Sequence, residues 1–107
     1  SSGYRIGPFE VESVLMELPY VLECAVVGVP DERYGEECCA WIILHKGETA
    51  DEKEMKEYGN ASIARHKVPK YFLFVKEFPM NAAGKILKYK MREESLDRYN
   101  AQKNGNE

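Results

Sequence analysis

A nearly unbroken apolar stretch, ECCAWIILH at residues 37–45, constrains the fold of this chain more than any other feature. Its strand-like length and lack of alternation predict a β-strand that is buried on both sides over part of its length. The segment 21–30 is rich in β-branched residues and ends in Gly-Val-Pro, which predicts a second strand. Because only the turn-forming residues 31–35 separate the two, we expect an antiparallel pair. A third strand is predicted at 71–75.

A helix is expected before these strands, since Pro8 suits a first helical turn and Pro19 closes the segment. Its glutamates, Glu10, Glu12 and Glu17, are expected outside the apolar face. The apolar residues that fall mostly on one face are Phe9, Val11, Val14, Leu15 and Leu18.

A second helix is expected from a cap at Thr49 or Asp51 to about residue 65. Gly59 and Asn60 in its middle weaken it by about 1 kcal/mol relative to alanine. Residues 86 to about 99 predict a third helix, or a short strand that turns into one. The inward-facing residues of the second helix are expected to be Met55, Tyr58, Ser62 and Ile63.

With a short strand at 4–6, the order β-α-β-β-α-β-α predicts an α+β fold, in which helices flank a small three-stranded, mainly antiparallel sheet. The 107 residues, 44% hydrophobic and 31% charged, indicate one soluble globular domain. No apolar run approaches the roughly 20 residues of a membrane span, and no signal peptide is visible. Because an initial Met is lacking, we expect a piece of a larger protein, with residues 100–107 as a disordered polar tail.

The three cysteines, Cys24, Cys38 and Cys39, are odd in number and two are adjacent, which argues against a disulfide framework. They indicate a reducing compartment, and we therefore expect a cytoplasmic protein. The absence of C-x-x-C and the separation of the two histidines argue against zinc. The cysteines are expected to be small buried hydrophobes.

The formal net charge of −3 conceals an uneven distribution. Residues 1–50 contain 3 basic and 9 acidic residues, whereas residues 65–92 contain 8 basic residues and one acidic residue. This basic stretch is either a solvated face or a surface for an anionic partner such as a phosphate, a nucleotide or a nucleic acid.

Three loops carry candidate binding residues. In SSGYRIGP, residues 1–8, Arg5 is either a phosphate ligand or an ordinary surface residue. In PDERYGEE, residues 30–37, Tyr34 either stacks on a base or caps the sheet edge. In NAAGKI, residues 81–86, small neighbours leave Lys85 at the loop tip as a point charge with three donors.

The sequence shows no complete catalytic set. There is no persuasive Ser/His/Asp arrangement and no pair of carboxylates in an apolar setting, and Ile86 after Gly84-Lys85 excludes the common phosphate-binding loop. His45 and His66 are expected to be surface or strand-end histidines. The sequence therefore predicts a domain that contributes an anion-binding lysine to a site completed elsewhere.

Four segments in register carry a resemblance: SSGYRIGPFEVE, AVVGVPDERYGE, HKVPKY and FPMNAAGKILK. Together they closely resemble the small C-terminal domain of the adenylate-forming superfamily, which includes acyl-CoA synthetases, luciferases and peptide-synthetase adenylation domains. The match spans residues 1 to about 93, and its first and last segments are most similar to medium- to long-chain fatty acyl-CoA synthetases. The resemblance implies that residues 1–99 form the mobile lid domain of such an enzyme.

The resemblance implies a two-step ligase reaction. A carboxylate and ATP first give an acyl-adenylate, and CoA takes the acyl group after the domain rotates, with Mg²⁺ accompanying ATP outside this domain. Lys85 matches the catalytic lysine that reaches the carboxylate and phosphate oxygens, where a fixed cation stabilises developing charge. Arg5 matches an arginine near the nucleotide phosphate.

Contacts with CoA are implied on the opposite face. The stretch that matches residues 2–4 borders the pantetheine tunnel, and the other positions meet the nucleotide end of CoA. Lys88 and Lys90 are expected to be solvated or phosphate-facing charges. The residues implied in CoA binding are Ser2, Gly3, Tyr4, Tyr34, His66 and Lys70.

The sequence departs from the family pattern at two positions. Members often carry a lysine that helps to bind CoA where this chain has Asn60, and a Thr or Ser hydroxyl where it has Ala83. The expected partner is the large N-terminal domain of the same enzyme, and no nucleic acid is expected. The alternative function is a stand-alone module that binds a nucleotide, CoA or nucleic acid through residues 65–92.

Overall fold

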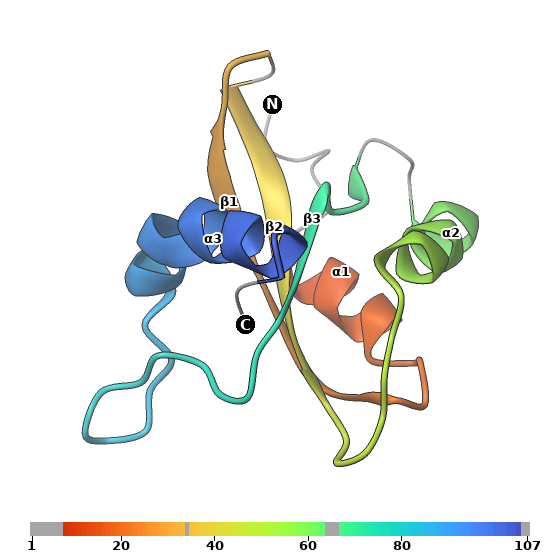
Figure 1. The fold of residues 1–107 in the computed structure, drawn as a ribbon, viewed down its shortest axis with the longest axis horizontal. Coiled ribbons are helices and arrows are strands. Elements are labelled where there is room, and N and C mark those ends of the chain that lie inside the picture. The colour runs from red at the N-terminus through yellow and green to blue at the C-terminus, as the bar shows by residue number, and fades with distance from the viewer. Residues whose placement is uncertain (1–7, 34, 64–66, 106–107) are drawn as a thin grey trace.

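The computed structural model describes residues 8–33, 35–63 and 67–105. Within these ranges the elements follow in the order α1 (Pro8–Leu15), β1 (Val21–Asp31), β2 (Gly35–Leu44), α2 (Glu52–Ser62), β3 (Tyr71–Phe74) and α3 (Lys88–Lys103), as Figure 1 shows. This order confirms the predicted α+β fold from the first helix onward. The strand expected at residues 4–6 lies outside the described residues.

Within the described ranges the three strands form one sheet in the order β1-β2-β3. β1 and β2 pair antiparallel, as predicted, from Val21↔Leu44 to Asp31↔Gly35. β3 pairs with β2 in parallel over a shorter register that ends at Ile42↔Phe74. The sheet is therefore mixed, with the antiparallel pair as its longer part, because α2 carries the chain back across the sheet between β2 and β3.

Helices cover both faces of the sheet: α1 and α2 lie on one side and α3 lies on the other (Figure 1). Successive side chains of β2 therefore enter different cores. Ala40 and Ile42 pack with residues of α1 and α2, whereas Cys39 and Trp41 pack with Met91 of α3. All four β2 side chains have 0% exposure. This confirms that the stretch 37–45 is buried on both sides over part of its length.

Helix α1 is shorter than expected, because it ends at Leu15 rather than close to Pro19. Val11 and Leu15 are buried, as predicted, but Phe9 is 77% exposed. Consecutive helical residues are about 100° apart, so Phe9 lies about 200° around the axis from Val11. The prediction that Phe9 faces inward was wrong, since so short a helix buries only a narrow stripe.

Helix α2 buries Met55, and Ile63 directly after the helix is also buried, as predicted, but Ser62 is exposed. The N-cap residue is Asp51, although its side chain makes no capping hydrogen bond. Gly59, which weakens the helix, is buried, and a Cβ atom added there would lie 3.2 Å from Cγ1 of Val68. The glycine therefore permits close packing of α2 on the segment that leads to β3.

Helix α3 begins at Lys88, directly after a β-bridge between Met80 and Ile86. The structure therefore shows the second of the two predicted arrangements, a short extended segment that turns into a helix. The helix continues to Lys103, into the segment expected to be a disordered tail. Gln102 anchors this last turn, because its side chain accepts a hydrogen bond from Phe74 N at 2.8 Å and donates one to Phe72 O at 3.0 Å.

The three cysteines are free thiols, of which Cys24 and Cys39 are buried and Cys38 is half-buried. The expectation of small buried hydrophobes is confirmed for the two buried residues. Burial raises the pKa of Cys39 to about 11, so this thiol is protonated at neutral pH.

Candidate functional site

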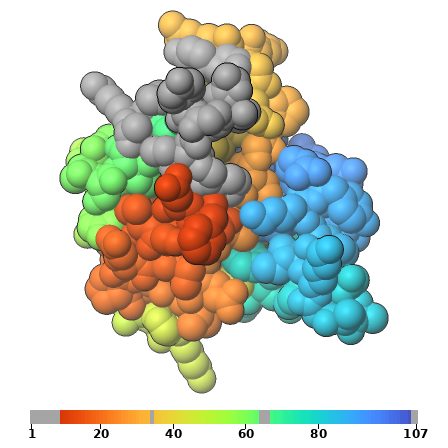
Figure 2. Space-filling view, turned by 180° about the vertical axis from the view of Figure 1, so that it is seen from behind, coloured from red at the N-terminus to blue at the C-terminus, as the bar shows by residue number. Residues whose placement is uncertain are grey.

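Lys85 lies on a narrow loop that connects β3 to α3. The base of the loop is closed by the Met80–Ile86 bridge and by a hydrogen bond from Leu87 N to Pro79 O at 2.9 Å. In Figure 1 the loop extends away from the sheet at the lower left, and Figure 2 shows this cyan segment as a protrusion at the lower right. The lysine is thus presented outside the helix–sheet body.

Asn81 organises the tip of this loop. Its side-chain oxygen accepts hydrogen bonds from the backbone N–H groups of Ala83 and Lys85, each at 2.9 Å. The backbone of Asn81 also pairs with Lys85 O and with Gly84 N. Gly84 has a φ of 87°, in the region that favours glycine. An asparagine four residues before the lysine was a signal for such a turn that sequence reasoning did not use.

The Lys85 side chain is exposed and makes no hydrogen bond or ion pair within the described ranges. Ala82, Ala83 and Gly84 are also exposed and add little bulk around it. Ala83, which replaces the usual hydroxyl residue, still donates its backbone N–H to Asn81. The loop therefore keeps its shape without a hydroxyl and presents a cation that can be placed against an anion on another body.

Lys70, the other described candidate, directly precedes β3, whereas the Lys85 loop follows that strand. Its Nζ is 3.2 Å from Oδ1 of Asp31 and 5.5 Å from the centre of the Tyr71 ring. The hydrogen bond and charge of Asp31 raise the pKa of Lys70. The structure therefore separates the two lysines and places Lys70 beside the end of the β1–β2 hairpin.

The remaining predicted site residues lie outside the described residues. For these the roles in phosphate and CoA binding stay predictions. They are Ser2, Gly3, Tyr4, Arg5, Tyr34 and His66.

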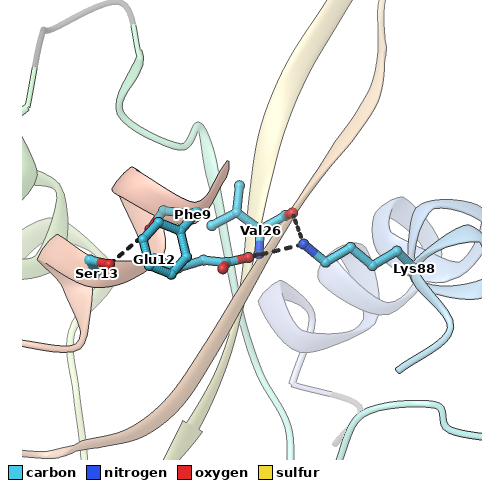
Figure 3. Close-up of polar contacts among 5 residues, drawn as sticks. All are labelled: Phe9, Glu12, Ser13, Val26 and Lys88. Atoms are coloured by element: carbon cyan, nitrogen blue, oxygen red, sulfur yellow. Dashed lines mark hydrogen bonds and ion pairs between the residues drawn. The ribbon is translucent and has the colours of Figure 1, made fainter. Parts of the chain in front are cut away.

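Lys88, expected to be a solvated or phosphate-facing charge, is paired with a carboxylate, although its side chain is still 40% exposed. Its Nζ lies 3.1 Å from Oε2 of Glu12 and 3.3 Å from Val26 O (Figure 3). The same glutamate oxygen accepts a hydrogen bond from Val26 N at 2.7 Å, so Glu12 faces the sheet rather than the solvent. Lys90 is exposed and has no such contact among the residues that the structure describes, which fits the solvated alternative.

A groove of about 980 Å³ opens near the base of the loop, with Lys76, Phe78 and Arg98 among its lining residues. Neither Lys70 nor Lys85 lines it. In the described part of the chain, no group of three or more His, Cys, Asp or Glu residues is placed to hold a metal ion. No helix in the same part has the length and apolar character needed to cross a bilayer.

These features define a small α+β domain that presents a lysine on a projecting loop. The sequence model of the family described as AMP-binding enzyme C-terminal domain matches residues 10–85. The chain belongs to this family.

Individual relatives agree with this assignment. The chain is 48% identical over 91 residues to the mitochondrial medium-chain acyl-CoA ligase ACSF2 of Danio rerio, covering 85% of this chain and 15% of that protein. It is 40% identical over 99 residues to a long-chain-fatty-acid–CoA ligase of Bacillus subtilis, covering 92% and 18%. The crystal structure of apo MatB from Rhodopseudomonas palustris superposes with a TM-score of 0.82 at 37% identity, covering 91% and 19%. The chain thus spans less than a fifth of the length of each relative.

Proposed function

We propose that this chain is the mobile C-terminal domain of an ATP-dependent acyl-CoA synthetase and that Lys85 is its adenylation lysine. The observation that carries the proposal is the Lys85 loop, which presents an exposed cation, without a partner in the described ranges, on a tip of small residues. The family match extends to this residue. The relatives named as ligases are several times longer, which supports placing the remaining site in a large N-terminal domain.

In the first step, a carboxylate oxygen of the acid attacks ATP, the acyl-adenylate forms and pyrophosphate leaves. The ammonium group of Lys85 donates to the carboxylate and phosphate oxygens, where negative charge develops in the transition state. Its position on a loop with a glycine tip allows the cation to be delivered and withdrawn as a unit. Mg²⁺ that accompanies ATP is proposed to bind outside this chain, since the described residues offer no acidic cluster for it.

In the second step, the thiol of CoA takes the acyl group and AMP is released. The placement of Lys70 before β3 and of the Lys85 loop after it supports a cycle in which different parts of the domain serve the two steps. Lys70 is proposed to exchange its contact with Asp31 for a phosphate of CoA. Arg5 is proposed to meet the nucleotide phosphate, and the segment 2–4, with Tyr34 and His66, to border the CoA path.

The test uses the full-length enzyme with Lys85→Ala. We expect pyrophosphate release from acid and ATP to fall by about 100-fold or more, while thioester formation from supplied acyl-adenylate persists. Lys90→Ala is the matched control, because Lys90 is an exposed lysine five residues further along. Equal losses in both half-reactions would overturn the role of Lys85.

The alternative, a stand-alone module that uses the basic stretch 65–92, gains no support from the described residues. Lys70 and Lys88 are each paired with a carboxylate, and Lys70 precedes β3 whereas the Lys85 loop follows it. Salt-sensitive binding of DNA or RNA by the chain would favour that alternative.

A further inference from the structure

We infer that Glu12 and Lys88 are positioning residues for Lys85, forming a bridge that fixes the base of the lysine loop. This inference rests on the proposed function of Lys85. It assigns a role to a lysine that the sequence suggested was solvated or phosphate-facing.

The position of Lys88 in the chain ties it closely to Lys85. It is the first residue of α3 and lies three residues after Lys85. Of the two residues between them, Ile86 is bridged to Met80 and Leu87 donates its N–H to Pro79 O. Because both intervening residues are held by backbone contacts, the chain between the two lysines has little freedom to move. A contact that fixes Lys88 therefore also fixes the end of the loop nearest to Lys85.

Lys88 is anchored by Glu12 and Val26. Oε2 of Glu12 accepts from both Val26 N and Lys88 Nζ, and Lys88 also donates to Val26 O (Figure 3). Val26 lies on β1, an outer strand of the sheet in the part of the chain that the structure describes, so no described strand pairs with these backbone groups. The bridge thus joins α1, the sheet edge and α3 through the backbone of a strand. This backbone holds Lys88 more rigidly than another surface side chain would.

The charge of the bridge also bears on Lys85. The Glu12 side chain is only 17% exposed, and its carboxylate is shared by two donors, whereas the Lys88 side chain is 40% exposed. Glu12 neutralises Lys88 and directs its ammonium group toward β1. The bridge therefore does two things for Lys85: it fixes the start of α3, and it keeps a second nearby cation from competing for the substrate anions.

The experiment measures both half-reactions in the full-length enzyme with Lys88→Met, Glu12→Gln and the double variant. We expect each single change to lower kcat for adenylation by about 10- to 100-fold, with KM for ATP within about twofold, because geometry rather than binding is lost. Thioester formation from supplied acyl-adenylate should be unchanged. The double variant should lose no more than the poorer single variant, since both changes break one bridge.

Two further variants control the interpretation. Lys88→Arg retains a charged donor and should recover adenylation to within about threefold of the wild type. Lys90→Met removes an exposed lysine from the same helix and should leave both half-reactions unchanged. Unaltered kcat in Lys88→Met, additive losses in the double variant, or equal losses in both half-reactions with a lowered melting temperature would each overturn the positioning role.

Lys85→Ala in the same series distinguishes failure of the proposed function from failure of the positioning role. If that variant keeps adenylation, the proposed function fails and the positioning role fails with it. If Lys85→Ala loses adenylation while Lys88→Met keeps it, only the positioning role fails.

Discussion

The hydrogen bond between Trp41 of β2 and Ser95 of α3 gives a sharp prediction about stability. Trp41 Nε1 donates to Ser95 Oγ at 2.8 Å, and both residues have 0% exposure. Ser95→Ala leaves the indole N–H buried without an acceptor, which costs about 1–3 kcal/mol. The better helix propensity of alanine offsets about 0.5 kcal/mol. We therefore expect the free energy of unfolding to fall by about 0.5–2.5 kcal/mol, and the melting temperature by about 4–8 °C for each kcal/mol lost.

Urea unfolding followed by the fluorescence of the single tryptophan, and by far-UV circular dichroism, measures this change. Asp97→Ala, at an exposed position of the same helix, is the control for helix propensity. In a Trp41→Phe chain, which lacks the N–H group, Ser95→Ala should be neutral or slightly stabilising. A change within about 0.3 kcal/mol in the wild-type background, or an equal loss in the Trp41→Phe background, would refute the reasoning.

Two further predictions concern the lysine loop and the buried thiol. Asn81→Ala removes the acceptor for two loop amides, so hydrogen exchange at Ala83 N and Lys85 N should accelerate. The free energy of unfolding should change by less than about 0.5 kcal/mol. Unaltered exchange at the two amides would contradict this prediction. Burial raises the pKa of Cys39 from 9.0 to about 11. The buried protonated thiol therefore contributes its full stabilisation below pH 9.0, and this contribution is lost as the pH rises from 9.0 to about 11. Urea unfolding should show about 2–3 kcal/mol of this loss, and the fall should be shallower in Cys39→Ala; identical pH profiles would count against the assignment.

Local patterns were sufficient to predict the strands and the Lys85 loop. The apolar run at 37–45 and the glycine before Lys85 are each contained in a few residues, and the structure shows the expected strand and turn. The antiparallel pairing of β1 with β2 also followed, because a short turn leaves few other arrangements.

Long-range side-chain contacts could not be predicted in the same way. Glu12 and Lys88 are 76 positions apart, and each is an ordinary charged residue within its own helix. Gln102 and Phe74 are 28 positions apart, so the last turn of α3 looked like a free polar tail. In both cases the structure depends on a partner that becomes adjacent only when the sheet and helices pack.

In the described part of the chain β1 and β3 are the outer strands of the sheet, and the side chains bound to them have a consequence for self-association. Glu12 and Lys88 occupy backbone groups of Val26 on β1, and Gln102 occupies those of Phe72 and Phe74 on β3. A fibril grows when one chain adds its open strand edge to that of the next, and these side chains take up the donors and acceptors that such growth requires. In the proposed cycle the domain rotates against its partner, and pairing with another chain at Val26, Phe72 or Phe74 would first have to break these side-chain contacts.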